Sequence, residues 1–166
     1  MLFALSPAPD RPRDGGDRPA RCVALFIAAA VFVYKMRAFL GLNYSLDLYL
    51  HTQIARSWLE GSPFAENFTG YHLSQHTYIL LLPLGLLAKP FGAPGLLFVL
   101  SLAAGCSFYL AFRLLRLYGA TAGWALPLSA VITLGPLAAN NWQDTQHGFH
   151  VELLEPCLAL FLLWCL

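Results

Sequence analysis

The chain has 166 residues, of which 58% are apolar and only 11% are charged. Soluble domains average about 45–50% apolar and about 25% charged residues, so this chain has too few charges to cover the surface of a soluble globule. A net charge of +1 and the apolar composition also exclude a nucleic-acid binder and a disordered protein. The composition therefore predicts an integral membrane protein of the all-α class, a polytopic bundle of transmembrane helices.

Residues 1–21 differ from the rest of the chain, because they combine proline and glycine with many charges. They hold the following charged residues: Asp10, Arg11, Arg13, Asp14, Asp17, Arg18 and Arg21. Such a composition predicts a disordered tail, and four arginines ahead of an apolar segment place it on the cytoplasmic side. Residues 22–166 are expected to form the transmembrane domain.

The apolar segments of that domain are expected at residues 22–40, 78–88, 96–115, 122–139 and 151–166. A membrane-spanning helix needs about 20 residues, so segment 78–88 is short and either crosses the membrane or is re-entrant. If it does not cross, the polar loops 41–76 and 140–150 share the outer side and Arg113 and Arg116 lie inside. If it crosses, the two loops lie on opposite sides. The last segment is too short to span, which predicts a chain truncated at its C-terminus.

The loop 41–76 contains a predicted amphipathic helix. Leu46, Leu50, Ile54 and Trp58 recur every four residues, which predicts one apolar stripe facing lipid or the bundle. Ser45 fits an N-cap, and Gly61 fits the C-terminal stop. Asp47 and His51 share a neighbouring face, because they too are four positions apart.

Ionisable residues concentrate in and beside the two polar loops. All the histidines and all the acids outside the tail lie there: His51, His72, His76, His147, His150, Asp47, Glu60, Glu66, Asp144, Glu152 and Glu155. Ionisable groups near membrane depth are costly, so this concentration predicts a functional site.

The order of several short motifs resembles a known family. The motifs are Leu46-Asp47-Leu48, Gly61-Ser62-Pro63-Phe64, His72-Leu73-Ser74 and Phe149-His150. Together they are similar to bacterial and archaeal membrane proteins of the domain of unknown function 2079 family, which in turn resembles the GT-C superfamily of membrane glycosyltransferases. The resemblance covers residues 22–166 and implies the N-terminal part of a GT-C-like bundle.

The resemblance also implies a reaction, in which a sugar is taken from a polyprenyl-phosphate donor at the outer face of the membrane. Asp47 would be the catalytic base on the acceptor hydroxyl. A divalent metal or an arginine would neutralise the leaving phosphate. By the same resemblance, the substrate-binding residues would be Arg56, His72, Asn141 and His150. The metal ligands would be Asp144 and His147.

Two other interpretations remain open. Pro83, Pro127 and Pro136 interrupt apolar segments, as in many transporters, so a transporter or another non-enzymatic membrane protein is an alternative. Lys35 and Arg37 are the charges within the first apolar segment, and each is expected to snorkel or to face a polar cavity. A fragment without activity is the third interpretation. All three place the chain in the cell membrane as a multi-pass protein with the lipid bilayer as partner.

Overall fold

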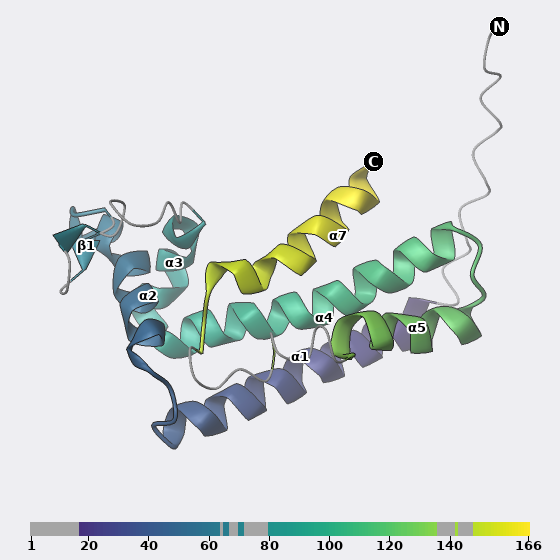
Figure 1. Ribbon diagram of the computed structural model, residues 1–166, viewed down its shortest axis with the longest axis horizontal. Helices are drawn as coiled ribbons and strands as arrows, with labels where there is room; N and C mark the ends of the chain where they lie inside the picture. The colour runs from purple at the N-terminus through teal and green to yellow at the C-terminus, as the bar shows by residue number, and fades with distance from the viewer. Residues whose placement is uncertain (1–16, 64, 67–69, 72–79, 136–141, 143–147) are drawn as a thin grey trace, which may run out of the picture.

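The computed structural model of the protein describes residues 17–63, 65–66, 70–71, 80–135, 142 and 148–166. Their regular secondary structure is helical apart from one short antiparallel pairing of β1 (Ala65–Glu66) with β2 (Gly70–Tyr71). Two long helices, α1 (Asp17–Leu40) and α4 (Ala93–Leu117), lie side by side (Figure 1). The predicted all-α class is therefore confirmed.

Helix α1 begins earlier than the sequence analysis placed it. Residues 17–21 were expected in the disordered tail, but they form the first turn and more of α1. Asp17 favours a start here, because a carboxylate in the first turn interacts well with the helix dipole. Pro19 is tolerated, because the backbone N–H that it lacks would have no helical partner in the first turn. The remaining residues of the expected tail, 1–16, lie outside the described residues.

Helices α1 and α4 are antiparallel and approach each other closely at Gly105. A Cβ atom on Gly105 would lie 2.5 Å from the carbonyl oxygen of Ala24. Arg113 Nη1 contacts Asp17 Oδ2 at 2.7 Å, and the hydroxyl of Tyr109 donates to the same oxygen at 3.3 Å. Arg113 thus lies at the end of the pair where α1 begins.

Among the described residues, α1 and α4 are the two helices long and apolar enough to cross a membrane. Helix α3 (Leu81–Phe91) has 11 residues and α5 (Ala122–Leu134) has 13. An 11-residue helix is about 16 Å long, about half the hydrocarbon thickness of a bilayer. The expected segment 78–88 thus contributes to a helix too short to span.

Helix α5 is also shorter than the expected segment 122–139. It ends at Leu134, and the backbone N–H of Gly135 donates to Val131 O at 2.9 Å. Gly135 is extended, with φ −66° and ψ 171°, because a residue before proline disfavours the helical conformation. The described part of this segment therefore ends one residue before Pro136.

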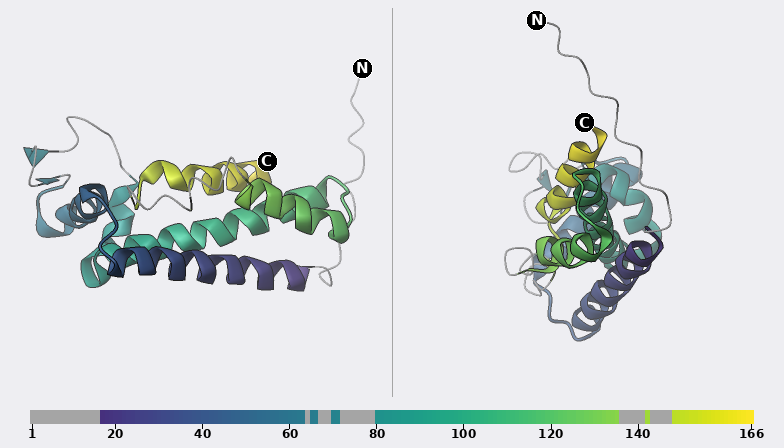
Figure 2. Two further views of the ribbon diagram at one scale, coloured as in Figure 1. Left: turned by 60° about the horizontal axis from the view of Figure 1, so that its bottom comes forward. Right: turned by 90° about the vertical axis from the view of Figure 1, so that its right-hand side faces the viewer.

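Helix α4 is the centre of the fold. It contacts α1, α3, α5 and α7 (Glu155–Cys165), the last of which follows a 3-10 turn, η4 (Val151–Leu154). In the left view of Figure 2, α4 lies between α1 and α7. Helices α2 (Leu46–Ser57) and α3 pack on each other near the start of α4.

The predicted amphipathic helix is present, and its ends are where they were expected. Ser45 caps α2, a 3-10 turn η2 (Trp58–Glu60) continues it, and Gly61 ends it in the left-handed conformation with φ 83°. The indole N–H of Trp58 donates to Leu82 O at 2.6 Å and ties this end to α3.

The predicted stripe of α2 is buried only in part. Ile54 is fully buried, but Leu46 is 63% exposed, and the buried face also includes Leu48, His51 and Thr52. Burial of the two polar side chains is possible because His51 Nδ1 lies 2.8 Å from Asp47 O and Thr52 Oγ1 donates to Leu48 O at 2.7 Å. Counting apolar residues alone missed this, because these polar atoms are satisfied by the helix's own carbonyl groups.

Candidate functional site

Asp47 lies in the first turn of α2, near the end of the helix pair where α1 stops and α4 starts. Its backbone N–H donates to the Oγ of Ser45 at 3.3 Å. A carboxylate in this turn is also stabilised by the helix dipole. The side chain is 38% exposed, so the carboxylate is accessible to another molecule.

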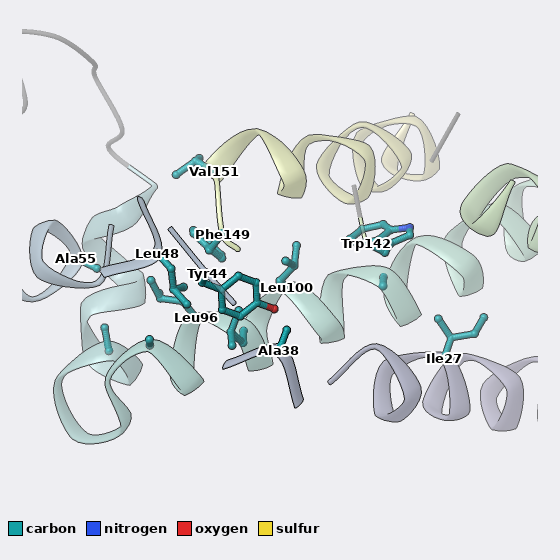
Figure 3. Packing of buried hydrophobic residues seen from close by; sticks show 14 of the residues in the cluster. Ile27, Ala38, Tyr44, Leu48, Ala55, Leu96, Leu100, Trp142, Phe149 and Val151 are labelled. Carbon is teal, nitrogen blue, oxygen red and sulfur yellow. The ribbon is translucent and has the colours of Figure 1, made fainter. Parts of the chain in front are cut away.

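The described part of the second polar loop, residues 148–150, runs past the start of α2. Gly148 has φ 78°, and a Cβ atom there would lie 2.9 Å from Cδ1 of Tyr44. Phe149 is fully buried beside Tyr44 and Leu48 (Figure 3). His150 is extended, with φ −132° and ψ 148°. The buried phenylalanine thus holds the histidine next to it at the surface of α2.

The two polar loops meet through Asp47 and His150. Asp47 Oδ2 lies 3.8 Å from His150 Nε2, and His150 Nδ1 lies 3.8 Å from Glu152 Oε2. The imidazole, whose side chain is 31% exposed, therefore lies between two carboxylates. These residues of loops 41–76 and 140–150 therefore lie next to each other, and the expectation that both loops share the outer side of a membrane stays a prediction.

His51 is buried next to His150. It is 3% exposed, and its ring centroid is 4.9 Å from that of His150 and 6.2 Å from that of Phe149. Its Nδ1 carries the proton, because the backbone carbonyl oxygen 2.8 Å away can only accept a hydrogen bond. The spacing of four residues from Asp47 signalled this neighbour, but His51 was not among the expected site residues.

Lys35 of α1 contacts the second loop at Gly148. It is completely buried within α1, and its Nζ donates to Gly148 O at 3.4 Å. The Tyr44 hydroxyl donates to the Lys35 carbonyl oxygen at 3.1 Å, and the ammonium lies 5.8 Å from the centre of the Tyr44 ring. Of the two expectations for this residue, snorkelling is wrong, because Lys35 turns into the bundle. Arg37 is exposed.

We call this group of residues the polar end. It comprises Lys35, Tyr44, Asp47, His51 and residues 148–152. Its sequence signals were a charge within an apolar run, the i,i+4 pair on α2 and the acid beside the second loop. The contacts that join these segments are separated by up to 113 positions in the chain, so no local pattern could reveal them.

Arg56 is not part of the polar end. It is nine positions from Asp47, which places the two residues about 180° apart around an α-helix. Arg56 instead lines a separate cavity of about 660 Å³, together with residues of α1 and the turn between α3 and α4. The expectation that Arg56 binds a substrate held by Asp47 therefore has no support from its position.

The other expected site residues, His72, Asn141, Asp144 and His147, lie outside the described residues. No three histidine, cysteine, aspartate or glutamate side chains converge as metal ligands within the described part of the chain. Asp47 and His150 offer ligand types that a divalent metal accepts, but protein sites commonly use three or four such groups. The polar end alone therefore does not fit a metal centre.

The chemistry available at the polar end is proton transfer. An accessible carboxylate can accept a proton from a hydroxyl group within hydrogen-bond reach. The 3.8 Å between Asp47 Oδ2 and His150 Nε2 is longer than a hydrogen bond. Glu152, on the other side of the imidazole, favours an orientation in which His150 Nδ1 faces it.

In comparisons with known proteins, no family model, no curated protein and no solved structure matches the chain.

Proposed function

We propose that the chain is a multi-pass protein of the cell membrane that transfers a sugar from a polyprenyl-phosphate carrier at the outer membrane face. One observation supports this proposal most strongly. Asp47 and His150, which are 103 positions apart in the sequence, lie 3.8 Å from each other beside the end of the two apolar helices. The resemblance to the domain of unknown function 2079 family and to GT-C enzymes suggests the substrate class.

In this proposal Asp47 is the base that accepts the proton of the acceptor hydroxyl. His150 lies beside the carboxylate and binds substrate, and Glu152 orients its ring. His72 and Asn141 contribute further substrate contacts. Asp144 and His147 would hold a divalent metal, whose chemistry is to neutralise the leaving phosphate.

The test is to replace Asp47 by asparagine and to measure transfer of labelled sugar from a polyprenyl-phosphate donor in membranes containing the protein. We expect the rate to fall by about a hundredfold or more, because general-base catalysis contributes about 10²–10⁴-fold. Glu155→Gln is the matched control, because Glu155 is an exposed carboxylate at the start of α7 and its loss should leave transfer unchanged. Undiminished transfer by the Asp47→Asn protein would contradict the assignment.

A second candidate is transport, and Lys35 is the observation that favours it. A fully buried cation inside an apolar helix is expensive and often marks a substrate or ion pathway. In vesicles, transport predicts that Lys35→Met abolishes substrate uptake while Asp47→Asn leaves it intact. If the protein instead transfers sugar, Asp47→Asn should lower its activity.

A further inference from the structure

The cavity that contains Arg56 is separate from the polar end and has no role in the proposed reaction. It lies between the end of α1, one face of α2 and the turn between α3 and α4, and its volume is about 660 Å³. Binding sites for small molecules commonly have about 300–1,000 Å³. The residues that matter for its chemistry are Phe39, Tyr49, Gln53, Arg56, Glu60 and Phe91.

The position of the cavity along the helix pair indicates its surroundings. Helix α1 ends at Leu40 and α4 begins at Ala93, so the cavity lies at the end of both helices that could cross a membrane. If these helices span the bilayer, this end is at the depth of the lipid headgroups. Tyr49 supports that depth, because tyrosine is enriched at membrane interfaces, and its ring lies 6.4 Å from that of Phe39.

The charges in the cavity form one adjacent pair of opposite sign. Arg56 Nη2 donates to Glu60 Oε1 at 3.0 Å, and the two side chains are 42% and 49% exposed. Exposed pairs of this kind are weak, so a ligand with both charges can replace the contact at little cost. A ligand with only a negative charge would be repelled by the Glu60 carboxylate.

A zwitterionic headgroup with a primary ammonium matches this arrangement. A guanidinium binds phosphate oxygens through paired N–H donors, and a carboxylate accepts hydrogen bonds from an ammonium. The side-chain oxygen of Gln53, which also lines the cavity, is a second acceptor for the ammonium. A trimethylammonium group has no N–H to donate and would satisfy neither acceptor.

We propose that this cavity binds the headgroup of a phosphatidylethanolamine lipid, with the phosphate at Arg56 and the ammonium at Glu60. The lipid's chains would extend along the apolar ends of α1 and α4. This inference rests on the membrane location in the proposed function, but not on the sugar-transfer reaction.

The experiment reconstitutes the protein into vesicles of phosphatidylcholine alone, or of phosphatidylcholine with added phosphatidylethanolamine or phosphatidylglycerol. Flotation with the vesicles reports membrane insertion. Native mass spectrometry after detergent extraction then reports which lipid is retained. We expect the protein to float in every case and to retain phosphatidylethanolamine in preference to the other two lipids.

The variants assign the binding to this cavity. Arg56→Gln should lower retention of phosphatidylethanolamine about tenfold, because a charge-assisted contact to the phosphate is lost. Glu60→Gln should abolish the preference over phosphatidylcholine. Arg37→Gln is the matched control, because Arg37 is an exposed arginine near the same end of α1 and does not line the cavity. The Arg37→Gln protein should retain phosphatidylethanolamine as the unmodified protein does. Asp47→Asn should also retain the lipid normally.

Two results would overturn the proposal in distinguishable ways. A protein that floats but shows no preference for phosphatidylethanolamine, or that loses it equally with Arg37→Gln, refutes the headgroup site and leaves the proposed function intact. A protein that does not float refutes the membrane location, and both proposals fail together.

Discussion

The helix pair and the polar end are stabilised in different ways. Helices α1 and α4 approach closely at Gly105, the rings of Phe32 and Phe98 lie 5.8 Å apart between them, and one ion pair, Arg113 with Asp17, joins them where α1 begins. The polar end is instead built from short segments of α1, α2 and the second loop, which depend on a buried cation and one left-handed glycine. A simple apolar scaffold can thus hold a polar cluster whose geometry depends on a few single residues.

The largest effect is expected where the helix pair is closest. Gly105→Val should destabilise the protein by about 3 kcal/mol, because its side chain would enter space already occupied by the Ala24 carbonyl group and Ala28 Cβ. Thermal unfolding in detergent measures the change. Gly123→Ala is the control, since a Cβ atom there meets nothing within 4 Å. Equal stability of the two variants would mean that α1 and α4 do not approach as closely as described.

A smaller but more local effect is expected at the polar end. Gly148→Ala should cost about 2 kcal/mol, because its positive φ is unfavourable for alanine and its Cβ would press on the Tyr44 ring. Gly61→Ala separates the two causes, since Gly61 has a similar φ of 83° but open space around it. We expect about 1 kcal/mol for Gly61→Ala, measured by the same unfolding assay. If both variants lose the same stability, the contact with Tyr44 is not tight.

The ion pair that joins α1 to α4 should also contribute more to stability than the exposed pair in the Arg56 cavity. Asp17→Asn should cost about 1.5 kcal/mol, because the Asp17 side chain is 11% exposed and lies 2.7 Å from the Arg113 guanidinium. Glu60→Gln should change stability by less than about 0.5 kcal/mol in detergent, since the Arg56–Glu60 pair is exposed. The two variants are compared at low and high salt. A larger loss for Glu60→Gln would reverse the assignment of which pair stabilises the fold.

Much of the helix pair was predictable from the sequence, and the polar end only in part. Apolar run lengths located α1 and α4, and Ser45 and Gly61 marked the ends of the helical stretch that begins with α2. The start of α1 at Asp17 was missed, because a proline and flanking charges resemble a tail when packing is ignored.

The polar end depends on tertiary contacts that sequence patterns do not contain. Clustering of ionisable residues pointed to Asp47 and His150, but burial of His51 depends on a hydrogen bond to its own helix. Arg56 was misplaced because its closeness to Asp47 in the sequence ignored the half-turn difference around α2. Lys35 turns inward because Gly148 O is there to accept its hydrogen bond.

The proposed function depends most directly on Asp47 and His150 being neighbours in the folded protein, and cross-linking tests this. In a protein whose four native cysteines are replaced by serine, Asp47→Cys and His150→Cys are combined and treated with a short bifunctional thiol reagent. We predict an intramolecular cross-link between the two positions, identified by mass spectrometry of the digested protein. The control pair, Arg56→Cys with His150→Cys, lies across α2 and should not react. Absence of the first cross-link, or equal yield from both pairs, would contradict the juxtaposition on which the proposed function rests.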